Sequence, residues 1–243
     1  MKLTASFDYP SIPPGYYDLV FHRGSGIQSK WHRMKFLRIG KEMGDYSAHL
    51  DIGCGGGTLI GSLPSGSLSI GVDIAQPQIS YAQKKYGTQM HMFQLIDPGG
   101  HLPFKAHRFD LVTLIEVIEH LSQKEIYSLL GEVHRVLQPG GRILLSTPNY
   151  KSLWPLIEWM LNRLGEISYA KQHINHYNHP WLETLLKKAG FVKIKLTAFQ
   201  GLGPFFALLH WKLADIIAKL EPKILVSRMG LLLLGEGYKG FKV

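Results

Sequence analysis

Short apolar runs alternate with helix-like segments through the middle of this 243-residue chain. The run at 110–115, Asp-Leu-Val-Thr-Leu-Ile, is too apolar to leave either face in water, so we predict a central strand there. Such strands, separated by helices, are typical of a parallel sheet that helices cover on both faces. We therefore predict an α/β, doubly wound, Rossmann-like fold. Further strands are expected at 48–52, 68–72, 90–96 and 142–147, with helices at 76–86 and 122–137.

The two ends of the chain depart from this alternation. Residues 1–28 are rich in Pro, Gly and Tyr and are expected to form an irregular arm, followed by a helix at 29–43. We predict that 1–44 forms a lid on a main domain, 45–243, which carries an apolar helical insertion at about 200–228. Beyond 148 we expect helices at 153–164, 181–189 and 203–220 and strands at 191–197 and 229–234. One face of the 203–220 helix would carry Phe205, Phe206, Leu209, Leu213, Ile216, Ile217 and Leu220.

Positive charge is concentrated at the ends of the sequence. Lys and Arg number 27 against 18 acidic residues, a net charge of +9. Residues 1–42 hold 7 basic and 3 acidic side chains, 195–243 hold 7 and 3, and 43–194 hold 13 and 12. This suits an anionic partner such as a membrane surface, an acidic lipid or nucleic acid, although solubilising charge on exposed helices explains it equally well.

Cysteine usage and hydropathy bear on the compartment. The single cysteine, Cys54, excludes an internal disulfide, which fits a reducing environment. The first residues lack the apolar core of a signal peptide, and no apolar run reaches about 18 residues. We expect a cytoplasmic protein that is at most peripheral to a membrane.

A glycine-rich loop follows the first predicted strand. In Leu-Asp-Ile-Gly-Cys-Gly-Gly-Gly-Thr, residues 50–58, glycines allow a tight turn and let a ligand approach bare main chain. Asp51 at the strand end could accept hydrogen bonds from a ligand ammonium, and Asp73, about 20 residues after the loop, stands where a ribose would lie. A phosphate-binding dinucleotide loop is disfavoured because Thr58 occupies the third glycine position of G-x-G-x-x-G.

These motifs resemble those of the class I S-adenosylmethionine-dependent methyltransferases. The resemblance covers 45–198 and rests on 50–57, 71–74, 109–112 and 137–141, which stand in the order of that family's motifs. It implies a mostly parallel seven-stranded sheet and S-adenosylmethionine as cofactor. It also implies a cofactor-binding set made of Asp51, Gly53, Cys54 and Gly55 for the methionyl part, Asp73 for the ribose, Ile74 and Asp97 for the adenine, and Glu116 near the sulfonium. Asp97 could alternatively open an Asp-Pro-Gly-Gly turn.

The segment Glu-Val-Ile-Glu-His, 116–120, resembles one in ubiquinone-pathway O-methyltransferases and in metal-dependent small-RNA 2′-O-methyltransferases. By this resemblance Glu116, Glu119 and His120 would bind a divalent ion such as Mg²⁺ or Zn²⁺, with one further ligand from His173, His176 or His179. Similar strings occur in methyltransferases that need no metal, where these side chains only shape the pocket.

Methyl transfer would be an in-line displacement at the sulfonium methyl, assisted by a base if the acceptor stays protonated. Our candidate base is His176, followed by His120 and His173. The apolar segment at 203–234 indicates a small lipophilic acceptor, namely a quinone precursor, polyketide or lipid, with O-methylation favoured, and also permits docking on an anionic membrane. It could instead pack on the sheet or form a homodimer interface.

Two other functions remain as alternatives. The isoelectric point near 9.5 prompts a nucleic-acid methyltransferase. No dense basic cluster lies between 165 and 201, however, and Thr-Pro-Asn-Tyr at 147–150 lacks the N/D-P-P-Y arrangement of base-amino methyltransferases, so nucleic acid is disfavoured. A non-catalytic S-adenosylmethionine-binding protein would require loss of acceptor-site chemistry, of which the sequence gives no sign.

Overall fold

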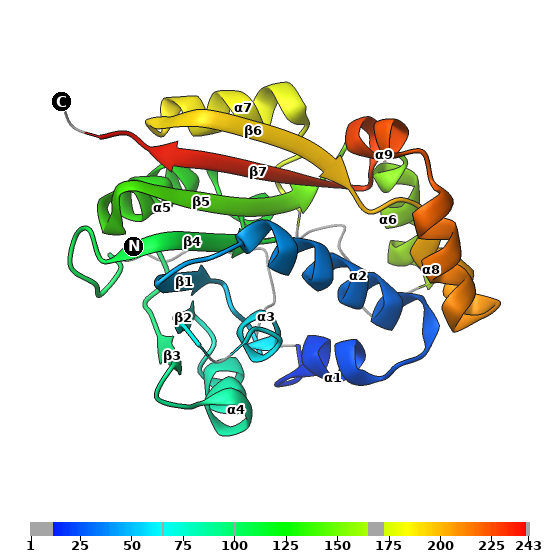
Figure 1. The fold of residues 1–243 in the computed structure, drawn as a ribbon, viewed down its shortest axis with the longest axis horizontal. Coiled ribbons are helices and arrows are strands. Elements are labelled where there is room, and N and C mark those ends of the chain that lie inside the picture. Colours follow the sequence, from blue (N-terminus) through cyan, green and yellow to red (C-terminus); the bar gives the residue numbers. More distant parts are fainter. Residues whose placement is uncertain (1–11, 65, 100, 165–172, 242–243) are drawn as a thin grey trace.

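A seven-stranded sheet with strand order β3-β2-β1-β4-β5-β7-β6 forms the centre of the chain (Figure 1). The computed structural model describes residues 12–64, 66–99, 101–164 and 173–241. Strand β7 runs antiparallel to β5 and β6, and all other neighbouring strands are parallel. The strands are β1 (Ala48–Ile52), β2 (Leu68–Asp73), β3 (His91–Leu95), β4 (Phe109–Ile115), β5 (Leu137–Pro148), β6 (Phe191–Phe199) and β7 (Leu232–Lys239). The chain reverses its strand order between β1 and β4, and ligands bind beyond the carboxyl ends of the strands at such a point.

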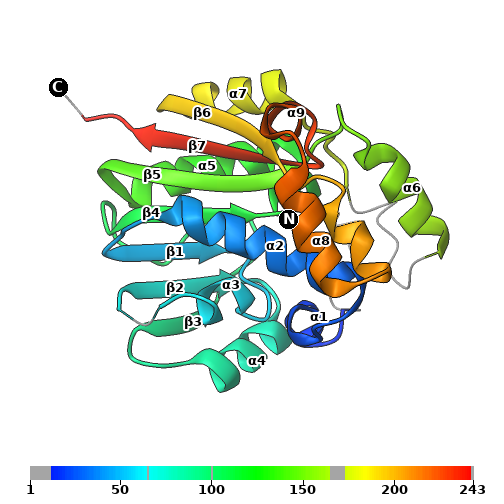
Figure 2. The same cartoon turned by 45° about the vertical axis from the view of Figure 1, so that its right-hand side comes forward.

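Helices cover both faces of this sheet. Against one face lie α5 (Gln123–Val136) and α7 (His179–Lys188), and against the other lie α2 (Gly26–Met43) and α3 (Thr58–Gly61) (Figures 1 and 2). The remaining elements are α1 (Tyr16–His22), α4 (Gln76–Tyr86), the short η2 (Ile118–His120), α6 (Trp154–Leu164), η3 (Gly203–Leu208), α8 (Trp211–Leu220) and α9 (Lys223–Met229). The doubly wound, mostly parallel fold that the sequence predicted is confirmed.

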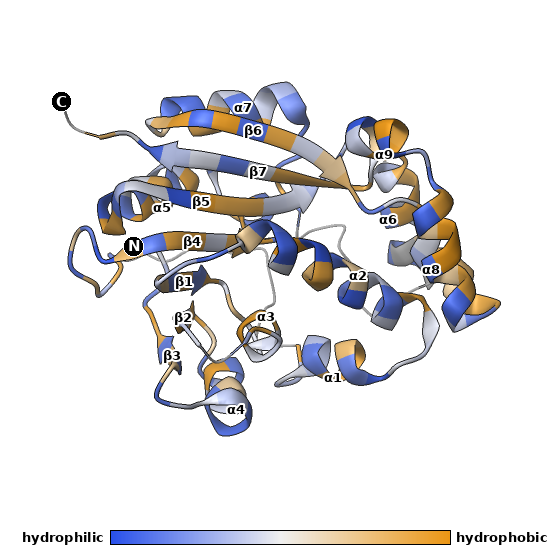
Figure 3. Ribbon diagram, in the orientation of Figure 1, coloured by the Kyte–Doolittle hydropathy of each residue, from blue (hydrophilic) through white to orange (hydrophobic). Residues whose placement is uncertain are grey.

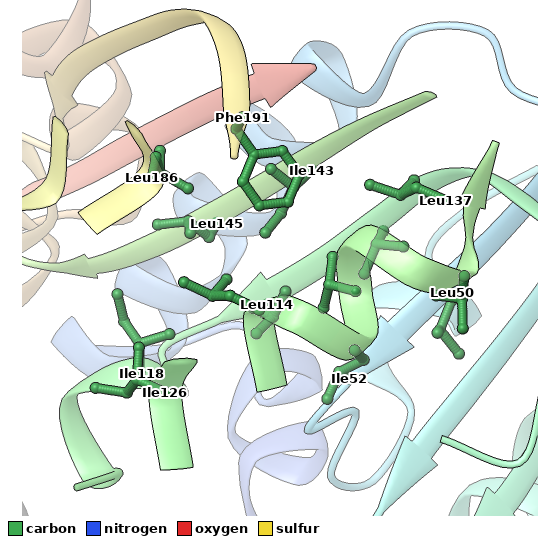
Figure 4. Packing of buried hydrophobic residues seen from close by; sticks show 14 of the residues in the cluster. Leu50, Ile52, Leu114, Ile118, Ile126, Leu137, Ile143, Leu145, Leu186 and Phe191 are labelled. Carbon is green, nitrogen blue, oxygen red and sulfur yellow. The ribbon is translucent and has the colours of Figure 1, made fainter. Parts of the chain in front are cut away.

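The alternation of side chains along each strand explains the two cores. Leu50, Leu114 and Leu145 point to the α5–α7 side, where they pack with residues such as Ile126 (Figure 4). On the other face of the same strands, Leu111 and Leu144 pack against α2, together with Ile39 and Met43. Both sets are buried, so the central strands have no face in water.

Several predicted elements are close to those observed. The helix predicted at 76–86 is α4, and the predicted strands at 48–52 and 110–115 are β1 and most of β4. Helix α5 begins after Ser122, whose side chain accepts from the Glu125 backbone N–H while the Glu125 carboxylate accepts from the Ser122 N–H. This pair of hydrogen bonds is a capping box, and the Ser-x-x-Glu spacing at 122–125 is its sequence signature.

Other predictions were wrong in detail. The arm at 1–28 is not irregular throughout, because 16–22 forms α1; residues 1–11 lie outside the described part of the chain. The single helix predicted at 203–220 is broken into η3 and α8, since the His210 side chain caps a new helix by accepting from the Lys212 N–H. Helix α9 was not predicted, and the last strand begins at Leu232 rather than at 229. Strand β5 begins at Leu137, before the predicted 142.

The N-terminal helices and the C-terminal insertion pack on each other. Lys30 of α2 forms a 2.7 Å ion pair with Asp215 of α8, and its ammonium lies 4.2 Å from the Trp211 ring centroid. Trp31 meets the Phe205 ring edge-on, and its carbonyl accepts from Gln200. These contacts hold α2 and α8 together at the carboxyl end of the parallel strands (Figure 2). Whether 1–44 acts as a lid stays a prediction.

Helix α1 is fastened to α4 by a buried carboxylate. Asp18 is fully buried and accepts hydrogen bonds from the hydroxyls of Tyr81 and Tyr86 and from the Lys85 ammonium, at 2.8, 2.6 and 2.5 Å. Burial opposes ionisation of Asp18, yet these donors together hold its pKa below the ordinary value. In the described residues no helix has the length and apolarity needed to cross a bilayer.

Candidate cofactor and acceptor site

The glycine loop leaves β1 through backbone conformations that favour glycine. Gly53 and Gly57 have φ angles of 75° and 77°, and the Gly53 N–H donates to the Val72 carbonyl at 2.8 Å. A Cβ atom on Gly53 would lie 2.6 Å from a methyl group of Val117. The loop therefore passes close to the end of β4 and presents bare main chain at the switch point of the sheet.

Asp73 ties this loop to the end of β2. One carboxylate oxygen accepts from the Gly55 N–H at 2.8 Å and the other from the Ala75 N–H at 2.9 Å. Ile74, next in the chain, is 48% exposed although it is apolar, and Asp97 is exposed just after β3. The three residues thus lie at the positions that ribose and adenine recognition would need, and their roles stay predictions.

Asp51 is the end of a buried row of polar side chains beneath α2. Its carboxylate accepts from the Thr113 hydroxyl at 2.6 Å, and that hydroxyl lies 2.8 Å from Nε2 of His49. Nδ1 of His49 lies 3.2 Å from the Ser69 hydroxyl, which in turn contacts the Tyr46 hydroxyl at 3.2 Å. While Asp51 is ionised, Thr113 gives its proton to the Asp51 carboxylate, so His49 must donate through Nε2 and accept at Nδ1. The row therefore fixes one tautomer of His49.

Burial sets the charges of this row. It lowers the pKa of His49 to about 3, so the imidazole is neutral. It raises the pKa of Asp51 to about 7, with the nearby Asp73 adding to the rise and the Thr113 hydrogen bond opposing it. Burial likewise raises the pKa of the Cys54 thiol, which is therefore no nucleophile. A ligand ammonium beside Asp51 would give its carboxylate a cationic partner and so favour the ionised form.

We call the group of Glu116, Glu119, His120 and His173 the acceptor side. Within it, Glu116 is bound by a lysine from the N-terminal region. The side chain of Lys35 on α2 is 3% exposed and its ammonium forms an ion pair with the Glu116 carboxylate. Glu116 itself has a φ of 56° and follows the end of β4. One of the predicted metal ligands is thus neutralised by a cation, and α2 reaches the position where the sulfonium was expected.

Glu119, His120 and His173 converge close to this pair. One ligand atom from each lies within 4.8 Å of the other two. Glu119 is fully buried, and among the described residues neither of its carboxylate oxygens has a hydrogen bond of good geometry, although the Thr147 hydroxyl is near enough to lower its pKa. Burial raises the pKa of Glu119 to about 7, which His173 opposes and Glu116 reinforces. A buried carboxylate without a donor costs free energy, so this position suits a ligand proton or a cation.

The fold brings His173 to this position by hydrogen bonds to η2. The Glu119 carbonyl accepts from the N–H groups of Ile174 and Asn175, at 2.9 and 3.2 Å, and the Asn175 side chain donates to the Leu121 carbonyl. On α6, Glu158 lies 2.6 Å from Nδ1 of His173, and its other oxygen accepts from the Tyr150 hydroxyl at 2.8 Å. His173 is therefore oriented by a carboxylate, as a general base or a metal-bound imidazole is.

The other predicted histidines lie elsewhere. The ring of His176 stacks on Tyr150 with centroids 4.1 Å apart, and the residue is exposed. His179 begins α7 and is not part of the Glu119 group. The structure thus joins His173, rather than Glu116, His176 or His179, to Glu119 and His120.

Sequence reasoning missed Lys35, Thr113, Glu158 and Tyr150. Lys35 had a usable signal, because it stands four residues from both Trp31 and Ile39 and so interrupts the buried stripe of α2. Thr113 could also have been found, as the polar residue in an otherwise apolar central strand. Nothing in the sequence near Glu158 or Tyr150 links them to a histidine beyond the next helix.

Similarity to known proteins shows that the chain is a class I S-adenosylmethionine-dependent methyltransferase, and the observed fold agrees. Residues 50–145 match a family model described as a methyltransferase domain. A demethylmenaquinone methyltransferase of Lactiplantibacillus plantarum is 26% identical over 215 residues, which span 79% of this chain and 89% of that protein. A ubiquinone biosynthesis O-methyltransferase of Azoarcus sp. is 32% identical over 133 residues, which span 50% of this chain and 56% of that protein.

Solved structures agree on the fold. An S-adenosylmethionine-dependent methyltransferase from Archaeoglobus fulgidus superposes with a TM-score of 0.64 at 20% identity, covering 92% of this chain and 100% of that one. Phosphoethanolamine N-methyltransferase 2 of Haemonchus contortus, in complex with S-adenosyl-L-methionine, gives 0.64 at 19% identity and covers 93% of this chain and 58% of that one. At these identities the likeness concerns the fold alone, and the acceptor must be argued from this chain's own site.

Proposed function

We propose that the enzyme transfers the methyl group of S-adenosylmethionine to a ring hydroxyl of a lipophilic acceptor of the quinone-precursor class. Two lines support this. Relatives of this chain are named for demethylmenaquinone and for ubiquinone biosynthesis, which supports an acceptor of the quinone class, and the second name specifies O-methylation. The acceptor side also combines a carboxylate and imidazoles with aromatic rings, including Trp31 and Trp154, whose centroids are 5.7 Å apart.

The single observation that carries the proposal is the buried Glu119 with its unpartnered oxygens beside His120 and His173. A phenolic hydroxyl has a pKa of about 10 and must lose its proton to attack efficiently. His173 is oriented through Nδ1 by Glu158, and we assign it the removal of that proton. We therefore place His173 ahead of His176 as the base, because His176 is exposed and stacked on Tyr150.

The chemical step is then a single displacement. The acceptor O–H bond breaks and its proton goes to His173, while a new bond forms between that oxygen and the methyl carbon. The bond from methyl carbon to sulfur breaks, and its electron pair stays on the neutral thioether of S-adenosylhomocysteine. Because the leaving group is already activated, alignment of oxygen, carbon and sulfur supplies much of the rate.

A divalent cation is the second candidate for this group. One carboxylate and two imidazoles form a donor set that suits Zn²⁺ and related ions, and Glu158 is placed as the carboxylate partner of a metal-bound His173. The residues present therefore fit an ion held by Glu119, His120 and His173. Such an ion would lower the pKa of the acceptor hydroxyl and orient its oxygen. Glu116 is the weaker candidate ligand because Lys35 already pairs with it.

The test uses methyl-labelled S-adenosylmethionine with the purified full chain. Candidate acceptors are a prenylated dihydroxybenzene, its O-methylated counterpart, and total RNA. We expect label on the free hydroxyl compound and not on the blocked one. We also expect His173→Asn to lower kcat by about a hundredfold or more, with His176→Asn as a matched control that keeps most of the activity.

Four outcomes would contradict parts of this proposal. Label on RNA would favour the nucleic-acid alternative, and donor binding without turnover on any acceptor would favour a non-catalytic protein. Full activity in excess chelator, together with no metal by elemental analysis, would eliminate the ion while leaving His173 as base. Loss of activity in His176→Asn with retention in His173→Asn would reverse our choice of base.

A further inference from the structure

Helices α8 and α9 lie at one end of the molecule, where hydrophobic and hydrophilic residues alternate along the ribbon (Figure 3). Leu209 and Ile224 are 76% and 75% exposed. Several exposed aliphatic side chains in one region indicate an interaction surface. We name the exposed residues of the segment 208–229, from the end of η3 through α8 and α9, the docking face. Its apolar members are Leu208, Leu209, Ile216, Leu220, Ile224, Leu225 and Met229.

The charges of the docking face have one sign. Lys212, Lys219, Lys223 and Arg228 are exposed between these apolar residues, and none of the four forms an ion pair with any residue that the structure describes. The two acids of this region are engaged within the fold. Asp215 pairs with Lys30, and the Glu221 carboxylate accepts from the N–H groups of Leu202 and Gly203.

Helix α8 carries apolar and basic residues on the same exposed side. Along α8 the exposed positions are 212, 216, 219 and 220, which fall on one side at a spacing of three to four residues, while Ala214 on the other side is buried. Gly203 of η3 packs against that buried side, close to Ala218. Three of the seven residues of the apolar face predicted for 203–220, Leu209, Ile216 and Leu220, are therefore exposed.

We propose that the docking face binds the surface of an anionic lipid bilayer. Aliphatic side chains at this position would enter the boundary between headgroups and acyl chains, and the four cations would meet the lipid phosphates. A second copy of this chain fits less well, because a twofold contact through the docking face would bring two like-charged sets together. The inference extends the proposed acceptor class but does not depend on turnover.

The docking face is connected to the active site through α2. Lys30 fixes α2 to α8 through Asp215, and one helical turn further along α2 Lys35 reaches Glu116. Both α8 and the cofactor loop lie at the carboxyl end of the parallel strands (Figures 1 and 2). The docking face and the cofactor loop are therefore at the same edge of the sheet.

The experiment is flotation of the full chain with vesicles that contain no acceptor, so that docking is measured apart from catalysis. One set holds equal parts of phosphatidylglycerol and phosphatidylcholine, and the other holds phosphatidylcholine alone. We expect binding to the anionic set that weakens as salt is raised. Lys212→Gln/Lys219→Gln should weaken it about 25-fold, about fivefold per lysine. The matched control is Lys124→Gln/Lys188→Gln, which removes the same charge from exposed positions on α5 and α7.

A second variant tests the apolar contribution. Ile216→Ser/Leu220→Ser changes exposed side chains only and should reduce binding at least tenfold while affinity for S-adenosylmethionine stays unchanged, which also verifies folding. Equal binding by the docking-face and control variants would overturn the proposal. So would absence of binding to anionic vesicles at low salt, or a dimer that the Ile216→Ser/Leu220→Ser variant abolishes. Vesicle binding without methylation of any quinol would refute the proposed function and leave the docking intact.

Discussion

Affinity for the methyl donor should depend on pH through Asp51. Burial raises the pKa of this carboxyl to about 7, whereas the ammonium of S-adenosylmethionine needs the ionised form. Below pH 7 the donor's amino group stays protonated, so the change comes from the protein. Affinity should therefore fall about tenfold for each pH unit below 7, about a hundredfold in all at pH 5. Calorimetric titration between pH 5 and 8 measures this directly.

The raised pKa of Asp51 also affects stability, because the folded state holds this proton more tightly than the unfolded state does. Its contribution is fully present below pH about 4 and is lost as the pH rises through about 7. The rise from 3.8 to about 7 is about three units, and at 1.36 kcal/mol per unit this amounts to about 4 kcal/mol. Asp51→Asn removes the titrating proton, so the variant should unfold with a higher free energy than the wild type at pH 8, but not at pH 4.

The control variants separate Asp51 from the acceptor side. Asp51→Asn should bind the donor weakly and without a pH slope between 5 and 7. Glu119→Gln should keep the slope, although the pKa of Glu119 is also about 7, because we place Glu119 beside the acceptor. A flat wild-type profile over this range, or an Asp51→Asn profile that still rises tenfold per unit, would refute the assignment of Asp51 to the donor ammonium.

Four further changes have defined outcomes. Thr113→Val removes the hydrogen bond that lowers the pKa of Asp51, so calorimetry should show the midpoint of the affinity profile above pH 7, while Thr113→Ser should leave it in place. Gly53→Ala places a Cβ 2.6 Å from Val117 at a φ of 75°, and we expect donor affinity to fall at least about tenfold, the equivalent of 1.4 kcal/mol. Asp73→Ala removes the acceptor of two backbone N–H groups and should weaken donor binding by about a hundredfold; unchanged affinity would exclude it from the ribose site. Asp18→Ala breaks a buried ion pair and should cost about 3 kcal/mol, with hydrogen exchange rising first in α1; equal exchange in α1 and α5 would contradict the fastening role.

Much of the cofactor side could be predicted because its determinants are local in the sequence. The glycines at 53, 55 and 57 stand directly after an apolar run, and positive φ angles at all three bear out the tight turn. Asp73 ends the next strand, and parallel pairing of β1 with β2 brings it to Gly55 without any further information.

The acceptor side could not be predicted in the same way, because its members come from distant segments. His173 meets Glu119 only because the backbone after residue 173 hydrogen-bonds to the Glu119 carbonyl. Lys35 reaches Glu116 across 81 positions of sequence, and Glu158 orients His173 from a separate helix. Periodicity assigns each of these residues to a helix or a loop, but it does not say which helices will lie side by side.

The sequence alone determined the parallel sheet, the order of the motifs and the edge at which we place the methyl donor, since these follow from apolar runs buried on both faces and from glycine's backbone freedom. Only the tertiary structure decided that Asp51 stands at the end of a buried polar row, that His173 replaces Glu116 beside Glu119, and that α8 turns aliphatic side chains outward. These features depend on how far each group is removed from water and on what charge faces it. Both are properties of packed elements rather than of any one segment.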